Sequence, residues 1–231
     1  MHRTPSIPEI AQRGRFIKRA LEQQSVYAIS DQDDLASVAS QQFKDVDVIL
    51  LWSQEREAVR WADAIAKTPK IETLTVAELL TDILPSLSQQ NRVVGLDWSA
   101  SPVEGEFNSI DIAERLRGEA IEGFVKRARR TERIFILENS VGPALMQSAA
   151  NVQKMFMPVW SDHDSAQLSI KGPWADMVAM EIPISNFLGL TLPWLAEQGW
   201  TVGPDFVHGA RTLELAPRDL ASRLSVRSVA A

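Results

Sequence analysis

Apolar and polar positions follow the same order twice along this chain. Residues 76–98 and 184–206 each have the pattern of an amphipathic helix, a short turn, and a strand that ends in an acid and an aromatic residue. Pro85 aligns with Pro193, and Asp97 aligns with Asp205, with the same spacing of 108 residues. A shared period of this length indicates a duplicated domain.

The correspondence extends over nearly the whole chain. An alignment without gaps joins residues 15–116 to residues 123–224 and contains 22 identical positions. Besides the helix and strand of 76–98, apolar periodicity in the first copy predicts helices over 10–24, 53–67 and 110–116, and strands over 26–29, 35–39, 46–52 and 71–75. We therefore predict an α+β fold of two tandem copies of one small domain, each a mixed sheet of about five strands flanked by helices. Copy one comprises residues 1–116 and copy two residues 117–231.

The most apolar strand of each copy ends in the dipeptide Trp-Ser. Trp52 and Trp160 close this strand, so we expect both indoles to be buried. Ser53 and Ser161 come next, ahead of acidic residues, and serine is a common residue at the position that caps a helix. We therefore predict that both serines are N-caps of the helix that follows.

Motifs shared by the copies resemble the DUF2750 family. They are Trp-Ser after the central strand, Leu-Pro-x-Leu in a helix, Val-Gly-x-Asp-Trp/Phe in a strand, and Asp-Ile/Leu-Ala-x-Arg/Lys-Leu near the end of each copy. The copies also differ, since Leu51 and Glu72 of copy one stand where copy two has Val159 and Met180. The resemblance implies a bacterial domain with no assigned activity, so it implies no catalytic residue.

Composition excludes several classes of protein. No apolar run reaches the roughly 18 residues that a membrane-spanning helix needs, and the N-terminus lacks the apolar core of a secretory signal. The absence of cysteine excludes disulfides, thiolate nucleophiles and thiolate metal sites. We therefore expect a cytoplasmic protein that has no membrane contact.

The charge is distributed unevenly between the copies. The net charge is −6; residues 1–116 carry 12 Lys and Arg against 18 Asp and Glu, whereas residues 117–231 carry 12 of each kind. An acidic chain without a basic stripe is a poor nucleic-acid binder, so we expect no nucleic-acid partner. One basic cluster is present, and we interpret it as a solvated helix face followed by the start of a strand: Lys126, Arg127, Arg129, Arg130 and Arg133.

Few residues have the pattern of a catalytic or metal site. His163 lies in the run Ser161-Asp162-His163-Asp164, where neighbouring side chains point in different directions and cannot form a triad. Neither a Gly-rich phosphate loop nor a known metal-ligand spacing occurs. We therefore predict no catalytic residue, no cofactor and no metal.

Two sets of residues remain as candidates for binding. The first is the acids near the strand ends in both copies, which either perform acid–base work or bond turn amides and the repeated basic residues. The second is tryptophans near loops or helix faces, which either mark a contact surface or pack in the core, the commoner position of a tryptophan. The candidate binding residues are Asp97, Asp205, Glu106, Glu214, Trp61, Trp98 and Trp174.

Two functions are consistent with these residues. The first is a non-catalytic protein-binding module, similar in role to small adaptor or immunity proteins; the alternative is an enzyme that acts on a small molecule through Asp205 and Glu214. The copies are joined by the short segment 117–122, which has possible helix breaks at Gly118 and Gly123. We expect them to pair about an internal pseudo-two-fold axis, which predicts a monomer.

Overall fold

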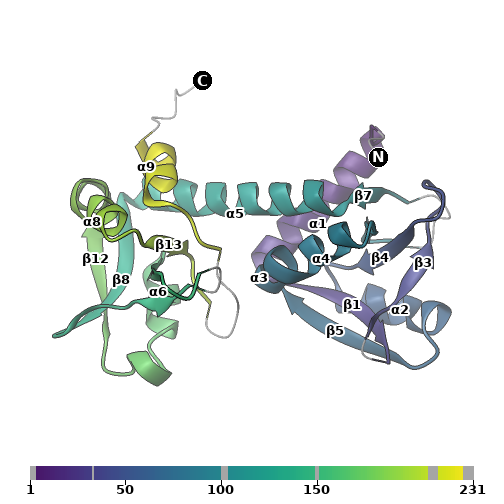
Figure 1. Ribbon diagram of the computed structural model, residues 1–231, viewed down its shortest axis with the longest axis horizontal. Helices are drawn as coiled ribbons and strands as arrows, with labels where there is room; N and C mark the ends of the chain where they lie inside the picture. The colour runs from purple at the N-terminus through teal and green to yellow at the C-terminus, as the bar shows by residue number, and fades with distance from the viewer. Residues whose placement is uncertain (1–3, 33, 100–103, 149–150, 208–212, 226–231) are drawn as a thin grey trace. The chain divides into compact units, whose positions relative to one another are not determined.

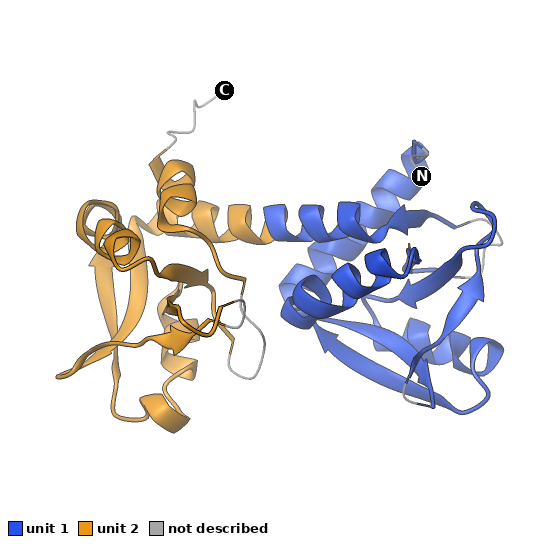
Figure 2. Ribbon diagram, in the orientation of Figure 1, with its two compact units in different colours: residues 1–118 blue, residues 119–231 orange. Residues whose placement is uncertain are grey.

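The computed structural model describes residues 4–32, 34–99, 104–148, 151–207 and 213–225. The chain divides into two compact units, residues 1–118 and residues 119–231 (Figure 2). One helix, α5 (Ser109–Thr131), begins in unit 1 and ends in unit 2. No helix among the described residues is both long enough and apolar enough to span a membrane.

Unit 1 contains two small sheets and the helices that pack on them (Figure 1). Its elements before α5 are α1 (Ile7–Gln23), β1 (Ser25–Asp31), β2 (Asp34–Leu35), β3 (Ser37–Ala39), β4 (Asp47–Leu51), α2 (Glu55–Ile65), β5 (Pro69–Thr75), α3 (Val76–Glu78), η1 (Leu79–Ile83), α4 (Leu84–Gln89), β6 (Val93–Leu96) and β7 (Glu106–Asn108). The strand orders are β2-β1-β5 and β3-β4-β6-β7. Strands β4 and β6 are parallel, and the other pairs are antiparallel.

Unit 2 repeats this order of elements with two differences among the described residues: η2 is added, and an isolated bridge between Val202 and Leu215 takes the place of β7. After α5 come β8 (Arg133–Asn139), β9 (Gly142–Pro143), β10 (Met146–Gln147), β11 (Met155–Val159), α6 (His163–Leu168), η2 (Gly172–Trp174), β12 (Val178–Pro183), α7 (Ile184–Asn186), η3 (Phe187–Thr191), α8 (Leu192–Glu197), β13 (Thr201–Pro204) and α9 (Pro217–Ser225). Its sheets are β12-β8-β9 and β10-β11-β13, with β11 parallel to β13. The predicted α+β fold and tandem duplication are confirmed.

The strands of each unit form two sheets rather than the single mixed sheet that we expected. In unit 1, β1 is joined to the residue after β4 by an isolated bridge between Tyr27 and Trp52. Phe135 and Trp160 form the same bridge in unit 2. Trp52 and Trp160 are both 0% exposed, as predicted, because each lies where the two sheets of its unit meet.

A proline changes the geometry of the helical run α3-η1-α4 in unit 1 and of α7-η3-α8 in unit 2. Residues Leu79–Ile83 and Phe187–Thr191 are π-helical, and the N–H of Leu84 donates to the carbonyl of Leu79 five residues earlier. Pro85 and Pro193 follow at the start of α4 and α8. A proline lacks an N–H and its ring collides with the carbonyl four residues earlier, so a wider turn before it removes the collision. The apolar pattern predicted the helix but not this local change.

Helix α5 continues through Gly118 and Gly123, the two positions that the sequence offered as possible helix breaks. Ile112 and Leu116 belong to the core of unit 1, and Ile121 and Phe124 belong to the core of unit 2. A glycine within a helix costs roughly 1 kcal/mol relative to alanine. Apolar burial on both sides of Gly118 offsets that cost, and the helix persists.

Candidate functional site

Asp97 and Asp205 occupy the same position in the two units, directly after the strands β6 and β13. Oδ1 of Asp97 accepts from the N–H of Ser53 at 2.6 Å, and Oδ2 accepts from the Ser53 hydroxyl at 2.9 Å. In unit 2, Oδ1 of Asp205 accepts from the N–H of Ser161 at 3.0 Å and from its hydroxyl at 2.9 Å. Each aspartate therefore ties the end of one parallel strand to the second residue after the other strand.

An arginine from the first helix of each unit completes this arrangement. Nε of Arg127 donates to the Ser161 hydroxyl at 2.8 Å, and a terminal nitrogen of Arg127 bonds Asp205. Arg19 lies farther from its partner, 3.9 Å from Oδ2 of Asp97. We refer to Arg19, Ser53 and Asp97, and to Arg127, Ser161 and Asp205, as the Arg–Ser–Asp centres. The arginine holds its centre more closely in unit 2.

The prediction that Ser53 and Ser161 cap the next helix is wrong. The N-cap residues are Gln54 and Asp162, and the Asp162 carboxylate accepts from the N–H of Ser165 at 2.8 Å. A hydroxyl that donates to a carboxylate forms a charge-assisted bond, which is stronger than accepting from a neutral helix N–H. The serine hydroxyls therefore bond the aspartates.

The backbone around each centre is fixed as well. Asp97 and Asp205 have left-handed φ angles of 49° and 46°, a region in which aspartate is more frequent than most residues. The indole N–H of Trp52 donates to the carbonyl of Trp98, and that of Trp160 to the carbonyl of Phe206, both at 2.9 Å. Hydrogen bonds therefore connect the strand end, the turn and the buried indole.

The electrostatics of the unit 1 centre are set mainly by burial. Burial raises the pKa of the Asp97 carboxyl, while the bonds from Ser53 and the charges of Arg19 and Arg15 act in the opposite direction. A serine beside a carboxylate suggests a nucleophile with a base, but Ser53 is 0% exposed and Ser161 is 1% exposed. Both hydroxyls are thus withdrawn from solvent and bond the aspartates, and Ser53 also borders a cavity of about 330 Å³ at the start of α2.

Glu106 and Glu214 have different partners in the two units. Glu106 is buried; it accepts from the Ser40 hydroxyl and, at 3.0 Å, from the N–H of Gln41. Glu214 accepts from the hydroxyl of Thr201 at 2.5 Å. Asp205 and Glu214, the pair of the enzyme hypothesis, therefore each bond a separate set of groups.

Sequence reasoning missed two further buried acids in unit 1. Glu9 accepts from the N–H of Ser6 at 2.6 Å, and Glu104 accepts from the N–H of Ser99 at 2.6 Å. The spacing of Ser6 and Glu9 is that of a capping box, so the sequence contained a signal for Glu9. Glu104 gave no signal, since Gln12, which donates to it at 2.7 Å, lies 92 residues away in sequence.

Two of the three candidate tryptophans lie in the cores. Trp98 and Trp174 are buried and offer little surface to a partner. Trp61 is half-buried; its ring meets that of Trp98 edge to face at 6.1 Å, and its indole N–H donates to the carbonyl of Ser99 at 3.2 Å. Only Trp61 of these three keeps substantial exposed surface.

Comparison with known protein families identifies the family of this chain. The sequence profile described as "Protein of unknown function (DUF2750)" matches residues 14–116 and again residues 121–224. This chain belongs to the DUF2750 family. Both Arg–Ser–Asp centres lie within the matched segments, so they are parts of two DUF2750 domains. The chain matches no curated protein sequence.

Two solved structures share a distant likeness with the DUF2750 pair. One is described as "Anabaena Tic22 (protein transport)"; it is 12% identical, the match covers 82% of this chain and 91% of that chain, and the TM-score is 0.26. The other is Tic22 from Plasmodium falciparum, 15% identical over 74% of this chain and 84% of that chain, also with a TM-score of 0.26. Scores this low support no statement about function.

The basic residues at the start of the second DUF2750 domain are largely engaged within that domain. Besides the bonds of Arg127, Arg129 donates to the backbone carbonyls of Leu224 and Arg223. Arg133 pairs with Glu181 at 2.8 Å. The interpretation of this cluster as a solvated helix face followed by the start of a strand is confirmed, since Lys126, Arg127, Arg130 and Arg133 are exposed and β8 begins at Arg133. Three of its arginines also bond other parts of the domain.

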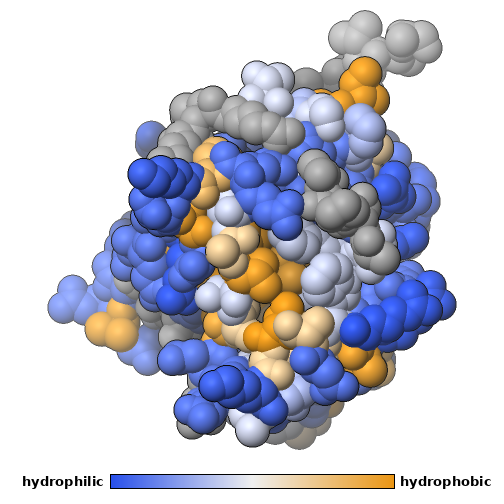
Figure 3. Space-filling model, turned by 90° about the vertical axis from the view of Figure 1, so that its right-hand side faces the viewer, coloured by the Kyte–Doolittle hydropathy of each residue, from blue (hydrophilic) through white to orange (hydrophobic). Residues whose placement is uncertain are grey.

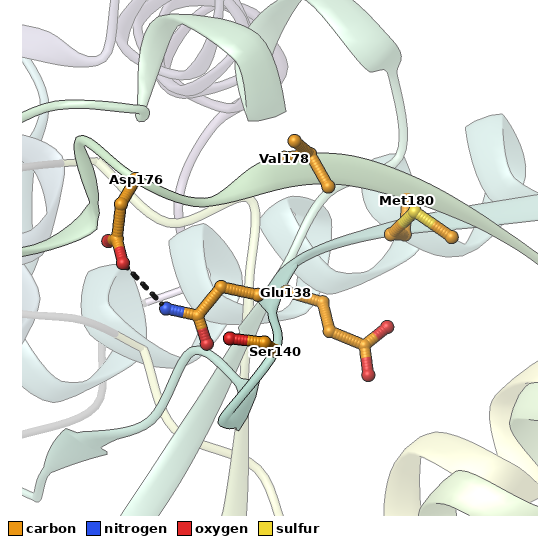
Figure 4. Close-up of a pocket in the computed structure, with 6 residues that line it drawn as sticks. Glu138, Ser140, Asp176, Val178 and Met180 are labelled. Atoms are coloured by element: carbon orange, nitrogen blue, oxygen red, sulfur yellow. Dashed lines mark hydrogen bonds between the residues drawn. The ribbon is translucent and has the colours of Figure 1, made fainter.

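Neither Asp205 nor Glu214 lines any of three cavities that described residues of the DUF2750 domains form. A cavity of about 500 Å³ lies by the β1–β2 turn, and one of about 330 Å³ lies beside the start of α2. The third, of about 440 Å³, is lined by Glu138, Asn139, Ser140, Asp176, Val178 and Met180 (Figure 4). No group of three or more acids and histidines among the described residues is arranged to hold a metal ion.

Proposed function

We propose that this chain is a non-catalytic protein-binding module built from two DUF2750 domains. The observation that carries the proposal is the role of the repeated acids and serines. In both domains the Arg–Ser–Asp centre joins two strand ends, with its serine buried. These repeated polar residues hold strand ends together. Of the six, only Ser53 borders one of the three cavities described above, and neither aspartate does.

The alternative of an enzyme using Asp205 and Glu214 receives no support from the geometry. A pair of catalytic carboxylates acts on a common point. Here Asp205 bonds Ser161 and Arg127, while Glu214 bonds Thr201. Neither acid lines the three cavities described above.

Support for binding comes from the surface of unit 1. Figure 3 shows apolar side chains gathered in the middle of the face on which β3 and α2 lie, between hydrophilic margins. The partly buried apolar residues of these elements include Val38 on β3, and Trp61 and Ile65 on α2. An apolar patch with a polar rim is typical of a protein-interaction surface.

Affinity capture tests this proposal. The full chain, immobilised through a terminal tag, is incubated with lysate of the cells that produce it, and the retained proteins are quantified by mass spectrometry. We expect a protein in about equimolar amount, which forms a complex with the purified chain in size-exclusion chromatography. The absence of any such protein, with the chain folded by circular dichroism, would contradict the proposal.

A matched variant separates binding from chemistry. D205N removes the charge of the candidate catalytic acid and keeps its size. Capture of the same partner by D205N and by the unmodified chain supports a binding module. Turnover of a small molecule by the chain, abolished in D205N while the fold is retained, would favour the enzyme instead.

A further inference from the structure

The same sheet edge has opposite chemistry in the two units. Strand β5 is the edge of the β2-β1-β5 sheet, and β12 is the edge of the β12-β8-β9 sheet among the residues that the structure describes. With the 108-residue offset, Val178 corresponds to Lys70, Met180 to Glu72, and Glu138 to Ser30. In unit 2, Val178 and Glu138 are direct cross-strand partners, so these three side chains share one face of the sheet.

Unit 1 closes this face with polar bonds. Nζ of Lys70 lies 2.8 Å from Oε1 of Glu72, and the Ser30 hydroxyl donates to the same oxygen at 2.9 Å. A charged pair on an edge strand also discourages the pairing of another strand. The edge of β5 is thus protected in the usual way.

Unit 2 leaves the equivalent face open. Val178 is 55% exposed and Met180 is 43% exposed, whereas the corresponding residues of unit 1 are charged. Within the described part of the chain, the Glu138 carboxylate has no hydrogen-bond or ion-pair partner. Figure 4 shows Val178 and Met180 along β12, with Glu138 on the neighbouring strand at the same cavity.

The fold does not require these apolar residues. Unit 1 builds the same pair of strands with lysine, glutamate and serine at the same positions. Exposing valine and methionine on a sheet edge is unfavourable in water and promotes pairing with other strands. The difference is therefore better explained by contact with another chain than by folding.

We propose that the β12 edge binds an extended segment of another protein, which adds to the sheet as a strand. Apolar residues at alternate positions of this segment cover Val178 and Met180, and a lysine or arginine on the same face pairs with Glu138. The added strand lies roughly 10 Å from β8, a distance that a long basic side chain and a glutamate span together. This inference rests on the proposed protein-binding function and names the chemistry of the partner.

A second copy of this chain does not supply the same contacts. Strand β12, with the sequence Val-Ala-Met-Glu-Ile-Pro, contains no basic residue to pair with Glu138. Pairing of two such strands would leave Glu138 without a cation on both sides. The charge of the open face therefore favours a basic and apolar segment from a different protein.

A random-peptide display library tests the proposal on the full chain. The library is selected on the unmodified chain, and the peptides recovered are compared on the variant V178K/M180E/E138S. This variant places on β8 and β12 the three side chains of unit 1, so it should fold, as circular dichroism will check. We expect peptides that alternate apolar residues with lysine or arginine, and a loss of affinity of more than about tenfold on the variant.

A charge swap sharpens this result. Replacing the basic residue of a recovered peptide by glutamate should abolish binding, and E138K should restore binding of that altered peptide. The reciprocal variant S30E/K70V/E72M copies the open face onto unit 1 and should raise the stoichiometry from one peptide to two. The role given to Glu138 would be contradicted if E138K did not restore binding of the altered peptide and S30E/K70V/E72M still bound a single peptide.

Several outcomes overturn the proposal. They are equal binding to the unmodified chain and V178K/M180E/E138S, recovery of no peptide, and recovery of peptides without a basic residue. Dimerisation in light scattering that the triple variant abolishes would identify a second copy as the occupant instead. The proposed function is tested separately. A protein partner that the triple variant captures as well as the unmodified chain does would support that function and would exclude only the β12 edge as its site.

Discussion

At the ends of the parallel strands, the two units place the same three side chains in the same roles. Asp97 and Asp205 each accept from the N–H and the hydroxyl of a buried serine, with an arginine nearby. At the edge of the neighbouring sheet the units differ. Unit 1 has the ion pair of Lys70 and Glu72, and unit 2 has the exposed pair Val178 and Met180.

This difference separates the needs of the fold from other needs. Removing an aspartate from a centre leaves a buried serine N–H without an acceptor, a loss that every copy of the fold would suffer. Replacing a pair of exposed side chains on an edge costs little in stability. The edge can therefore diverge, and its chemistry in unit 2 fits the strand addition that we propose.

The largest expected effect tests whether the buried tryptophans Trp52 and Trp160 are equally important to their two units. W52A and W160A each remove a fully buried indole and its 2.9 Å bond to a backbone carbonyl. We expect each to lower the free energy of unfolding of its unit by about 3–5 kcal/mol. Urea denaturation followed by circular dichroism measures the loss. A change below about 1 kcal/mol in either variant would break the equivalence of the two units.

The next effect tests the aspartates themselves. D97A and D205A leave the N–H and hydroxyl of Ser53 or Ser161 without their acceptor, and we expect each to destabilise by about 1–3 kcal/mol. D97N and D205N are the matched controls, since they keep an acceptor oxygen and a residue that tolerates a left-handed φ. These controls should lose less in thermal or urea denaturation. Equal stability of D97A and the unmodified chain would mean that the centre does not support the fold.

The arginines should reveal the asymmetry between the centres. Arg127 bonds both Ser161 and Asp205, whereas Arg19 lies 3.9 Å from Asp97. We expect R127A to cost about 1 kcal/mol, and R19A to stay within about 0.5 kcal/mol of the unmodified chain. Both arginines are partly exposed, which keeps the two values small. A larger loss in R19A than in R127A, measured by urea denaturation, would reverse this comparison.

The pH dependence of stability should distinguish Asp97 from an ordinary surface acid. Burial raises the pKa of Asp97 above its ordinary value of 3.8, so between these two values the native state binds more protons than the unfolded chain. The contribution of Asp97 to stability therefore falls as the pH rises through this window. The stability of the unmodified chain relative to D97N should decrease over the same range. A relative stability that rises with pH would contradict a raised pKa.

The smallest expected effect concerns association. The prediction of a monomer is tested by multi-angle light scattering on the purified chain, which should give 25.7 kDa over a wide range of concentration. The variant V178K/M180E/E138S should give the same mass. A mass that doubles with concentration would contradict the prediction, and its loss in the variant would place the contact at β12.

Much of this architecture could be predicted from the sequence. The period of 108 residues predicted the duplication, and the apolar run before Trp52 and Trp160 predicted two buried indoles. These signals are local or repeated, because side-chain periodicity follows directly from the geometry of helices and strands. The repetition of Asp97 and Asp205 also marks the acids of the centres, and bonding to turn amides and to the repeated basic residues is one of the two roles that the sequence predicts for them.

Other features depended on contacts between residues far apart in the chain. Ser53 has the local pattern of a helix cap, but Asp97, 44 residues later, comes within hydrogen-bond reach and accepts its hydroxyl. The buried Glu104 accepts from Gln12, 92 residues away, and Val178 is exposed on the edge strand β12. Hydrogen bonding and burial depend on which segments meet in three dimensions, and neither composition nor spacing specifies that. The sequence by itself determined the repeated elements, and the tertiary structure alone decided which polar groups hold them together and which apolar ones face solvent.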